Sequence, residues 1–388
     1  MALLNPIRTR PRVDRRSTVW QVDWILVLGV VALSSIGALL IWSATHNRES
    51  LTEGNPHFFL LRHAMNFAIG LILAVGAAVT DHRRLRLLTP VLYAGAIVGL
   101  ILVLVPGVGA VINGSRSWIQ LPGMSIQPSE FAKLAVIVGM ALLIAEKGET
   151  DRNETARTID VAQAVAVAAI PVLLVMLQPD LGTVMVLGSI VFGIIAVSGV
   201  PKRWMLGLVT AGVVIAALAI KLQVLKQYQL ARFVAFANPS GDLQGTGYNV
   251  NQARIAIGHG GVFGEGLLHG SQTQNAFVPE QHTDFVFTVA GEELGLIGAG
   301  AIIVLFALIL FRGLRIAINA RDAFGRLVAT GVVCWFAFQA FENIGMTLGI
   351  MPVTGLPLPF VSYGGSSMFA GLLAVGLLQN IHLRSHSF

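Results

Sequence analysis

The chain has 388 residues, of which 55% are hydrophobic and only 12% are charged, and its formal net charge is +6. Its mean hydropathy is +0.74. Soluble globular domains carry about 25% charged residues, so the composition excludes a soluble domain and predicts a protein that crosses a membrane several times. The excess of basic residues is then explained by positively charged cytoplasmic loops, and no nucleic-acid partner is expected.

Ten apolar segments of roughly 20 residues, the length that spans a bilayer, follow one another along the chain. They cover approximately residues 22–43, 58–80, 89–110, 129–146, 160–178, 180–199, 204–221, 285–311, 327–350 and 366–383. The sequence therefore predicts an all-α polytopic membrane protein with about ten transmembrane helices, in which residues 1–388 form a single integral membrane domain.

The distribution of Lys and Arg predicts the orientation of these spans. With the N-terminus inside, the inner segments hold 18 of the 26 basic residues, beginning with five arginines in residues 1–20, and the outer loops hold five. Because basic residues are retained on the cytoplasmic side, both termini are expected in the cytoplasm.

The longest loop on the predicted outer face is residues 222–283, between the seventh and eighth spans. Apolar residues at helical spacing between 225 and 236 predict a helix lying at the membrane interface. Nine glycines follow between Gly241 and Gly270. Phe263 stands where a nucleotide-binding Gly-x-Gly-x-x-Gly pattern needs glycine, so the glycines of residues 258–266 predict close backbone packing against the membrane surface. The histidines of the loop lack metal-ligand spacing, and no metal site is predicted.

Three carboxylates lie where this loop enters the eighth span. Asp284 precedes the span, and Glu292 and Glu293 lie about two turns further on. Asp284 fits either a helix N-terminal acid favoured by the helix dipole or a general base at the membrane edge. For Glu292 and Glu293 we expect at least one to be paired with a cation on another span, because lipid does not solvate an ionised group.

Other charged residues lie near the outer ends of earlier spans. Glu130 and Lys133 share a helix face at the start of the fourth span, either as a local ion pair or as part of a site for a charged headgroup. Arg62 lies in the second span, and Asp180 follows Gln178-Pro179.

Residues 351–366 join the last two spans and are rich in proline and glycine. This composition forbids a regular helix, and irregular backbone at membrane depth requires protein or a water-filled cavity to satisfy it. We therefore predict a rigid, re-entrant segment whose free amides line a polar pocket; it includes Ser362, Gly364 and Gly365.

Taken together, these motifs resemble the SEDS family, the polytopic RodA/FtsW/SpoVE peptidoglycan polymerases. The resemblance covers nearly the whole chain and rests on Arg62 and residues 127–133, 178–183, 258–270, 279–298 and 352–367, in that order. The Pro-Val-Thr-Gly motif, with Thr354, resembles the corresponding motif of the elongation (RodA) branch. By resemblance, Asp284 matches the family's essential aspartate. Arg62, Glu130, Lys133 and Asp180 match its functionally sensitive charges, and we place them with Ser362, Gly364 and Gly365 in a substrate-binding site.

The resemblance implies the SEDS fold in the bacterial cytoplasmic membrane. It also implies a glycosyltransferase that polymerises lipid II through β-1,4 bonds for cell-wall elongation. Its expected partners are a class B penicillin-binding protein, which is a transpeptidase, and membrane proteins of the elongation machinery. No cofactor is required by the sequence. Arg48, Arg62, Lys133 or a divalent cation (Mg²⁺ or Mn²⁺) are the candidates for neutralising the departing diphosphate.

Three alternatives to this function remain. Charges within spans and a broken re-entrant segment also suit a lipid II flippase. A polymerase of the division branch, similar to FtsW, has the same general sequence pattern. A non-catalytic scaffold of the envelope machinery is the third.

Overall fold

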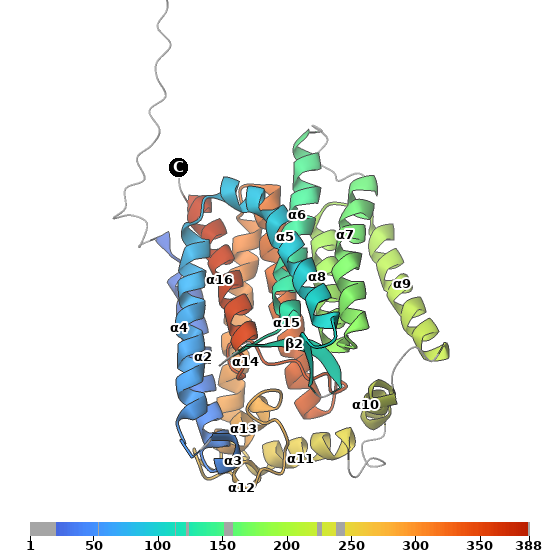
Figure 1. Ribbon diagram of the computed structural model, residues 1–388. Coiled ribbons are helices and arrows are strands. Elements are labelled where there is room, and N and C mark those ends of the chain that lie inside the picture. Colours follow the sequence, from blue (N-terminus) through green and yellow to red (C-terminus); the bar gives the residue numbers. More distant parts are fainter. Residues whose placement is uncertain are drawn as a thin grey trace, which may run out of the picture.

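The computed structural model describes residues 21–386 apart from 53, 113, 122–123, 151–157, 223–226 and 238–244. Long apolar helices form one bundle (Figure 1): α2 (Trp24–Thr45), α4 (Phe58–Val79), α5 (His82–Leu104), α6 (Pro128–Thr150), α7 (Thr158–Leu177), α8 (Leu181–Val197), α9 (Lys202–Lys221), α14 (Gly295–Ile318), α15 (Ala323–Leu348) and α16 (Gly365–His386). Within the described residues, nine helices have the length and composition to cross a membrane, and α8 is a shorter apolar helix. The predicted class and the number of about ten spans are confirmed. The basic segment 1–20 lies outside the described residues.

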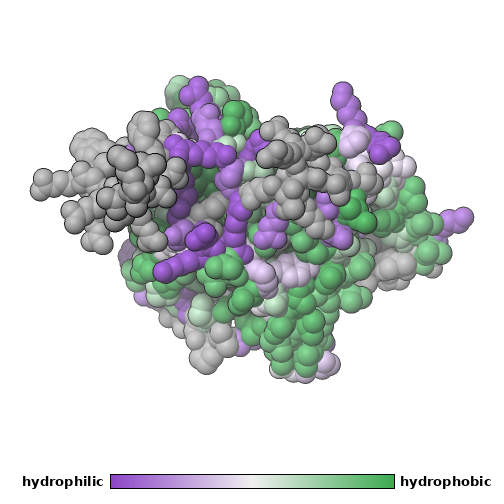
Figure 2. Space-filling view, turned by 90° about the horizontal axis from the view of Figure 1, so that it is seen from above, coloured by the Kyte–Doolittle hydropathy of each residue, from purple (hydrophilic) through white to green (hydrophobic). Residues whose placement is uncertain are grey.

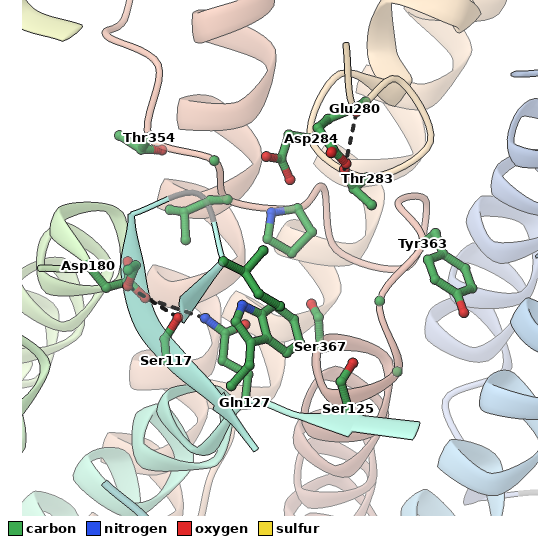
Figure 3. Close-up of a pocket in the computed structure, with 18 of the residues that line it drawn as sticks. Ser117, Ser125, Gln127, Asp180, Glu280, Thr283, Asp284, Thr354, Tyr363 and Ser367 are labelled. Atoms are coloured by element: carbon green, nitrogen blue, oxygen red, sulfur yellow. Dashed lines mark hydrogen bonds between the residues drawn. The ribbon is translucent and has the colours of Figure 1, made fainter. Parts of the chain in front are cut away.

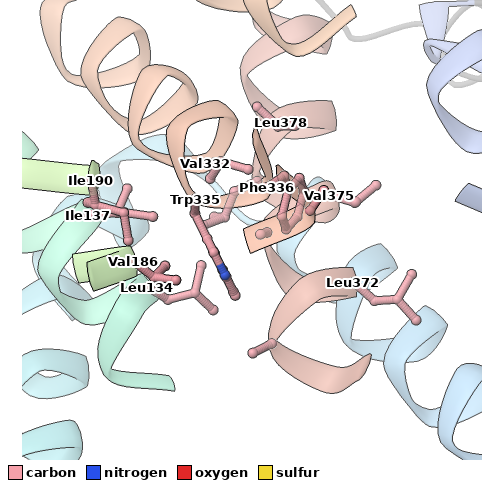
Figure 4. Packing of buried hydrophobic residues seen from close by; sticks show 14 of the residues in the cluster. Leu134, Ile137, Val186, Ile190, Val332, Trp335, Phe336, Leu372, Val375 and Leu378 are labelled. Atoms are coloured by element: carbon pink, nitrogen blue, oxygen red, sulfur yellow. The ribbon is translucent and has the colours of Figure 1, made fainter. Parts of the chain in front are cut away.

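The centre of the bundle is α15, which packs against α6, α8, α14 and α16. Figure 4 shows Trp335 and Phe336 of α15 surrounded by branched aliphatic side chains of α6, α8 and α16. Small residues let the backbones approach closely, as membrane helices require: a Cβ at Gly376 of α16 would overlap the carbonyl oxygen of Ala74 in α4.

A small sheet, which the sequence did not predict, follows α5. Its antiparallel strands β1 (Gly109–Ile112), β2 (Ser115–Leu121) and β3 (Met124–Ile126) pair in chain order. The predicted third span, 89–110, is wrong at both ends: the helix begins at His82 and stops at Leu104. Pro106 and Gly107 follow it, and Gly107 takes a positive φ of 90°, which favours glycine.

The long loop is largely helical within its described part. It contains α10 (Gln227–Ala237), α11 (Thr246–His259) and α12 (Ser271–Gln274). The helix predicted over 225–236 is therefore present as α10, while its position at a membrane interface stays a prediction. A further short helix, α3 (Glu49–Thr52), lies in the loop after α2.

The predicted eighth span, 285–311, is broken in two. Helix α13 (Val286–Glu293) has Leu294 as its C-cap, and α14 begins at the next residue, Gly295, whose φ is 64°. Residues 260–266, here called the glycine loop, satisfy both open helix ends. The amides of Glu265 and Gly266 donate to the carbonyls of Glu292 and Glu293, and the amides of Leu296 and Ile297 donate to those of Gly261 and Val262. Close backbone packing is found at Gly260 and Gly264, where a Cβ would overlap the carbonyls of Gly291 and Glu293, but not at Gly258 or Gly261, where a Cβ would meet nothing within 4 Å. Packing of the loop against the membrane surface stays a prediction.

The helices alternate between two ends of the bundle. At one, here called the basic end, Asp23 before α2 pairs with Arg312 of α14, and Arg86 of α5 pairs with Asp322 before α15. At the other, the pocket end, Asn47 and Arg48 after α2 donate to Gln274 and Gln281 of the long loop. This alternation agrees with the predicted topology, and the placement of the basic end in the cytoplasm stays a prediction from the charge distribution.

Candidate active site

A pocket of about 460 Å³ opens at the pocket end of the bundle. Its wall combines α4, the small sheet, the start of α8, α10, the residues before α13 and the Pro/Gly segment before α16. Figure 3 shows carboxylates of Asp284 and Asp180 reaching the same space from separate elements. The charged residues in the wall are two arginines and three acids: Arg62, Arg232, Asp180, Glu280 and Asp284.

Asp284 lies in the turn before α13, outside the membrane-spanning helices, and its half-buried carboxylate belongs to the pocket wall. Burial, together with the nearby Glu280 carboxylate, raises the pKa of Asp284 to about 7, although Arg232 acts in the opposite direction. Gly355 lies against this carboxylate, since a Cβ there would be 3.2 Å from Oδ2, and its φ of 79° also favours glycine. The Asp284 carboxyl group therefore has a pKa near neutral pH and lines the pocket.

The position of Asp284 depends on Asn343 of α15. The Asn343 side-chain amide donates to the carbonyl of Asp284 at 2.8 Å and to the carbonyl of Leu356 at 2.7 Å. One buried side chain thus joins the turn before α13 to the Pro/Gly segment. Both carbonyls would lose a partner inside the protein if Asn343 were replaced by an apolar residue.

Asp180 and Arg62, both predicted site residues, also line the pocket. Asp180 is the N-cap of α8, because its carboxylate accepts from the amide and the hydroxyl of Thr183 at 3.0 and 2.8 Å. The Arg62 guanidinium lies 4.3 Å from the ring centroid of Phe58. Arg62 thus contributes a cation to the pocket wall from α4.

Arg232 is a pocket residue that sequence reasoning missed, since it was counted only among the outer-loop charges. It lies on α10, lines the pocket and donates to the carbonyl of Thr354 at 3.0 Å. Glu342 of α15 was also missed, although a carboxylate within an apolar span was an available signal. The Thr354 hydroxyl donates to Glu342, so the two missed residues bind the same loop residue, Arg232 at its carbonyl and Glu342 at its hydroxyl.

Glu130 and Lys133 form the predicted ion pair, but their side chains are fully buried behind the pocket. The Lys133 ammonium lies 2.8 Å from Glu130 Oε1 and 2.9 Å from Gln339 Oε1, over the Trp335 ring at 4.7 Å. The Gln339 side-chain amide in turn donates to the carbonyl of Pro357, which lines the pocket. The pair therefore reaches the pocket through Gln339.

The Pro/Gly segment has no helix between residues 351 and 364, as predicted, and protein groups satisfy much of its backbone. Gly364 and Gly365 line the pocket. Ser362 is buried instead, and its hydroxyl accepts from the amide of Leu358. Tyr363 ties the segment to the turn before Asp284, because its amide donates to the carbonyl of His282.

The expected cation partner of Glu292 or Glu293 is absent from the described residues. Glu292 instead accepts from the amides of Gln272 and Thr273 and from the Thr273 hydroxyl. Glu293 accepts from the Ser43 hydroxyl at 2.6 Å. Hydrogen-bond donors of the long loop and α2 thus solvate these carboxylates, a solution that sequence reasoning did not consider.

Arg48, a sequence candidate for the diphosphate, donates to Gln281 at 2.6 Å and does not line the pocket as described. Among the described residues, no three His, Cys, Asp or Glu side chains converge to hold a metal ion. Mg²⁺ is commonly bound by one or two carboxylates together with substrate phosphates, and the acids of the pocket wall suit that kind of site.

The fold and the pocket together define a polytopic membrane protein with a carboxylate-bearing polar pocket at one end of its helical bundle. Comparison with known proteins is specific: residues 23–387 match the cell cycle protein family of FtsW, RodA and SpoVE. The chain belongs to this family, the SEDS family.

Several relatives match over most of their length. "Probable peptidoglycan glycosyltransferase FtsW" of Geobacter metallireducens is 35% identical over 93% of this chain and 95% of its own. "Stage V sporulation protein E" of Bacillus subtilis is 38% identical over 92% and 96%.

Solved structures agree with the fold. A chain of a peptidoglycan synthase complex, described as coordinating polymerization and crosslinking, has a TM-score of 0.78 and 33% identity over 95% of this chain and 99% of its own. The rod shape determining protein RodA of Thermus thermophilus has a TM-score of 0.69 and 31% identity, over 95% of this chain and 98% of its own.

Proposed function

We propose that this member of the family is a peptidoglycan glycosyltransferase that polymerises lipid II at the pocket, with Asp284 as the general base. The observation that carries the proposal is a half-buried carboxylate with a pKa of about 7 in the wall of a cavity that also holds Arg62 and Arg232. A base with a pKa near the operating pH is both sufficiently ionised and sufficiently basic to accept a proton.

In this reaction Asp284 accepts the proton of the acceptor sugar's 4-hydroxyl while that oxygen attacks the anomeric carbon of the donor. The new C–O bond forms as the bond to the diphosphate breaks, and the diphosphate leaves with the electron pair. Attack from the opposite face converts the α-linked donor into a β-1,4 product. Arg62 and Arg232 are the cations in the wall that neutralise the developing charge. If a divalent cation takes part, Asp180 would be the wall carboxylate to hold it together with the substrate phosphates, which leaves Asp284 to act as the base.

The remaining predicted site residues serve the pocket in different ways. Gly364 and Gly365 line it directly and admit substrate close to the backbone. Glu130, Lys133 and Ser362 are positioning residues in our proposal. They act through Gln339 and the amide of Leu358 to fix the Pro/Gly segment.

The test is polymer formation from purified lipid II in detergent with Mg²⁺, in the presence of a class B penicillin-binding protein whose transpeptidase is blocked. Asp284→Asn keeps the size of the side chain and removes the base, so its glycan ladder should be at least a hundredfold weaker. Glu280→Gln, also in the pocket wall, is the matched control and should retain the ladder. Equal ladders from Asp284→Asn and wild type would remove Asp284 from the mechanism. Absence of a wild-type ladder would favour the flippase.

We infer a transpeptidase partner from the likeness to the chain of a peptidoglycan synthase complex. From the charge distribution we infer that the protein lies in the bacterial cytoplasmic membrane with both termini inside. For the branch, Thr354 favours elongation and elongation-machinery partners, whereas relatives named FtsW and stage V sporulation protein E favour division or sporulation. Depletion in the native host distinguishes these. Rounded cells indicate elongation, and filaments without septa indicate division.

A further inference from the structure

A second cavity, of about 440 Å³, lies at the basic end of the bundle, opposite the active-site pocket. Its wall contains four arginines but one carboxylate: Arg83, Arg86, Arg321 and Arg384 against Asp322. Viewed from this end, hydrophilic residues gather across the middle of the surface, with hydrophobic residues at its edges (Figure 2). The positive-inside rule explains basic residues at this end, but it does not require arginines from α5, α16 and the turn before α15 to converge on one hollow.

Two of the arginines are held in fixed positions by the protein. Arg86 pairs with Asp322 at 2.8 Å, and its guanidinium lies 5.2 Å from the Phe324 ring centroid. Arg384 donates to Asn380 Oδ1 at 3.0 Å and to the carbonyl of Thr80 at 2.8 Å. The cationic wall is therefore built before any ligand arrives, which lowers the entropy that binding must overcome.

The other two arginines, Arg83 and Arg321, are exposed at the mouth of the cavity, where Arg321 Nε donates to the carbonyl of Ser385 at 3.2 Å. Arg83 shares a helix face with Leu87 and Val91, because residues four apart on a helix lie above one another. Leu87 is 75% exposed and Val91 is 66% exposed. An apolar surface that faces outward thus continues from the cationic mouth along α5, into the zone where lipid chains lie.

We propose that this cavity binds the phosphate headgroup of an anionic phospholipid from the adjoining leaflet, with its acyl chains along Leu87 and Val91. The phosphate would be neutralised by Arg83 and Arg321 at the mouth, over the fixed Arg86 and Arg384. Basic hollows between transmembrane helices on the cytoplasmic side suit such headgroups. The apolar face beneath Arg83 favours a lipid over a soluble phosphate ester, which has no chains to bury.

The experiment is native mass spectrometry of the detergent-purified chain titrated with dioleoyl phosphatidylglycerol. The test variant is Arg83→Gln with Arg321→Gln, which spares the arginines that hold Asp322 and Asn380. The matched control is Arg84→Gln with Arg203→Gln. These two exposed residues lie at the starts of α5 and α9 and are absent from the cavity wall. Both variants lose two positive charges, so only position differs.

At about fivefold per arginine, the test variant should bind phosphatidylglycerol roughly 25-fold more weakly, while the control binds like the wild type. Zwitterionic phosphatidylcholine and water-soluble glycerophosphoglycerol should bind the wild type at least tenfold more weakly than phosphatidylglycerol. Equal affinities of the two double variants would overturn the site. Equal affinity of the wild type for the soluble headgroup and the whole lipid would overturn the assignment to a lipid. Neither readout depends on polymerisation.

Discussion

Replacement of Lys133 by methionine tests the energetics of the buried charge pair behind the pocket. Both partners are almost fully buried, with side-chain exposures of 0% for Lys133 and 1% for Glu130. Removal of one member of a buried pair leaves an uncompensated charge and costs about 3–5 kcal/mol. Gln339 and the Trp335 ring lose their cation in the same step, so we expect a value in the upper half of that range.

The double variant Glu130→Leu with Lys133→Met removes both charges and should recover most of this loss, because apolar replacement of a whole buried pair is often nearly neutral. The assay is equilibrium unfolding in mixed micelles, followed by intrinsic tryptophan fluorescence, for the wild type, both single variants and the double variant. The resulting cycle isolates the pair's coupling energy.

Stability and activity should then separate. The double variant loses one of the two contacts that orient Gln339 toward Pro357 and keeps the other, from the Trp335 indole N–H. We therefore expect a well-folded protein that polymerises about tenfold more slowly than the wild type. A Lys133→Met variant as stable as the wild type, or a double variant no more stable than the single one, would refute the reasoning about the charge pair. Full polymerisation by the double variant would refute its positioning role.

Three further predictions concern the pocket and the packing. In our proposal ionised Asp284 is the base, and its pKa is about 7. The polymerisation rate should therefore fall about tenfold per pH unit below 7 and level off above it. Glu280→Gln should move this profile to lower pH, and an unmoved profile would contradict the assignment. The raised pKa also means that the folded state binds the Asp284 proton more tightly than the unfolded chain does. The contribution of Asp284 to the free energy of unfolding should therefore fall as pH rises from about 4 to about 7. Unfolding measured across this pH range, with Asp284→Asn as the reference, would detect the change. Gly193→Ala places a Cβ against the Cys334 sulfur and should destabilise the protein by about 1–3 kcal/mol, with partial rescue by Cys334→Ala. In the control, Gly188→Ala on the same helix, the new Cβ meets nothing within 4 Å, so this variant should be tolerated. Similar melting curves for the two glycine variants would contradict the packing.

The spans and a carboxylate of the pocket wall could be predicted from the sequence because both depend on local signals. Long apolar runs locate the helices, and an acid at their edge, such as Asp284, is conspicuous in such a sequence. The break at Leu294 and Gly295 could not be predicted in this way. Its hydrogen-bond partners lie in the glycine loop, about 30 residues earlier. Glycines such as Gly295 also occur inside unbroken membrane helices, where they allow close helix packing.

The contents of the pocket wall show the same limit. Arg232 resembles any other loop charge until α10 brings it beside Thr354. Outside the pocket, the sequence predicts a cation partner for at least one of Glu292 and Glu293, yet amide and hydroxyl donors from distant segments bind their carboxylates. Which polar group meets which across the bundle depends on tertiary packing, and a single sequence carries no direct record of it.

The hydrogen bonds between the glycine loop and the facing ends of α13 and α14 have a consequence for membrane insertion during synthesis. Lipid offers no partner for the backbone groups left open at the break between the two helices. The loop precedes α13 in the chain, so the ribosome releases it first and its donors and acceptors can be in place when the broken span is inserted. Extra residues added to the chain before residues 260–266 that delay the transfer of this loop across the bilayer should therefore leave α14 incompletely integrated into the membrane. The chain would then be exposed to quality-control proteases.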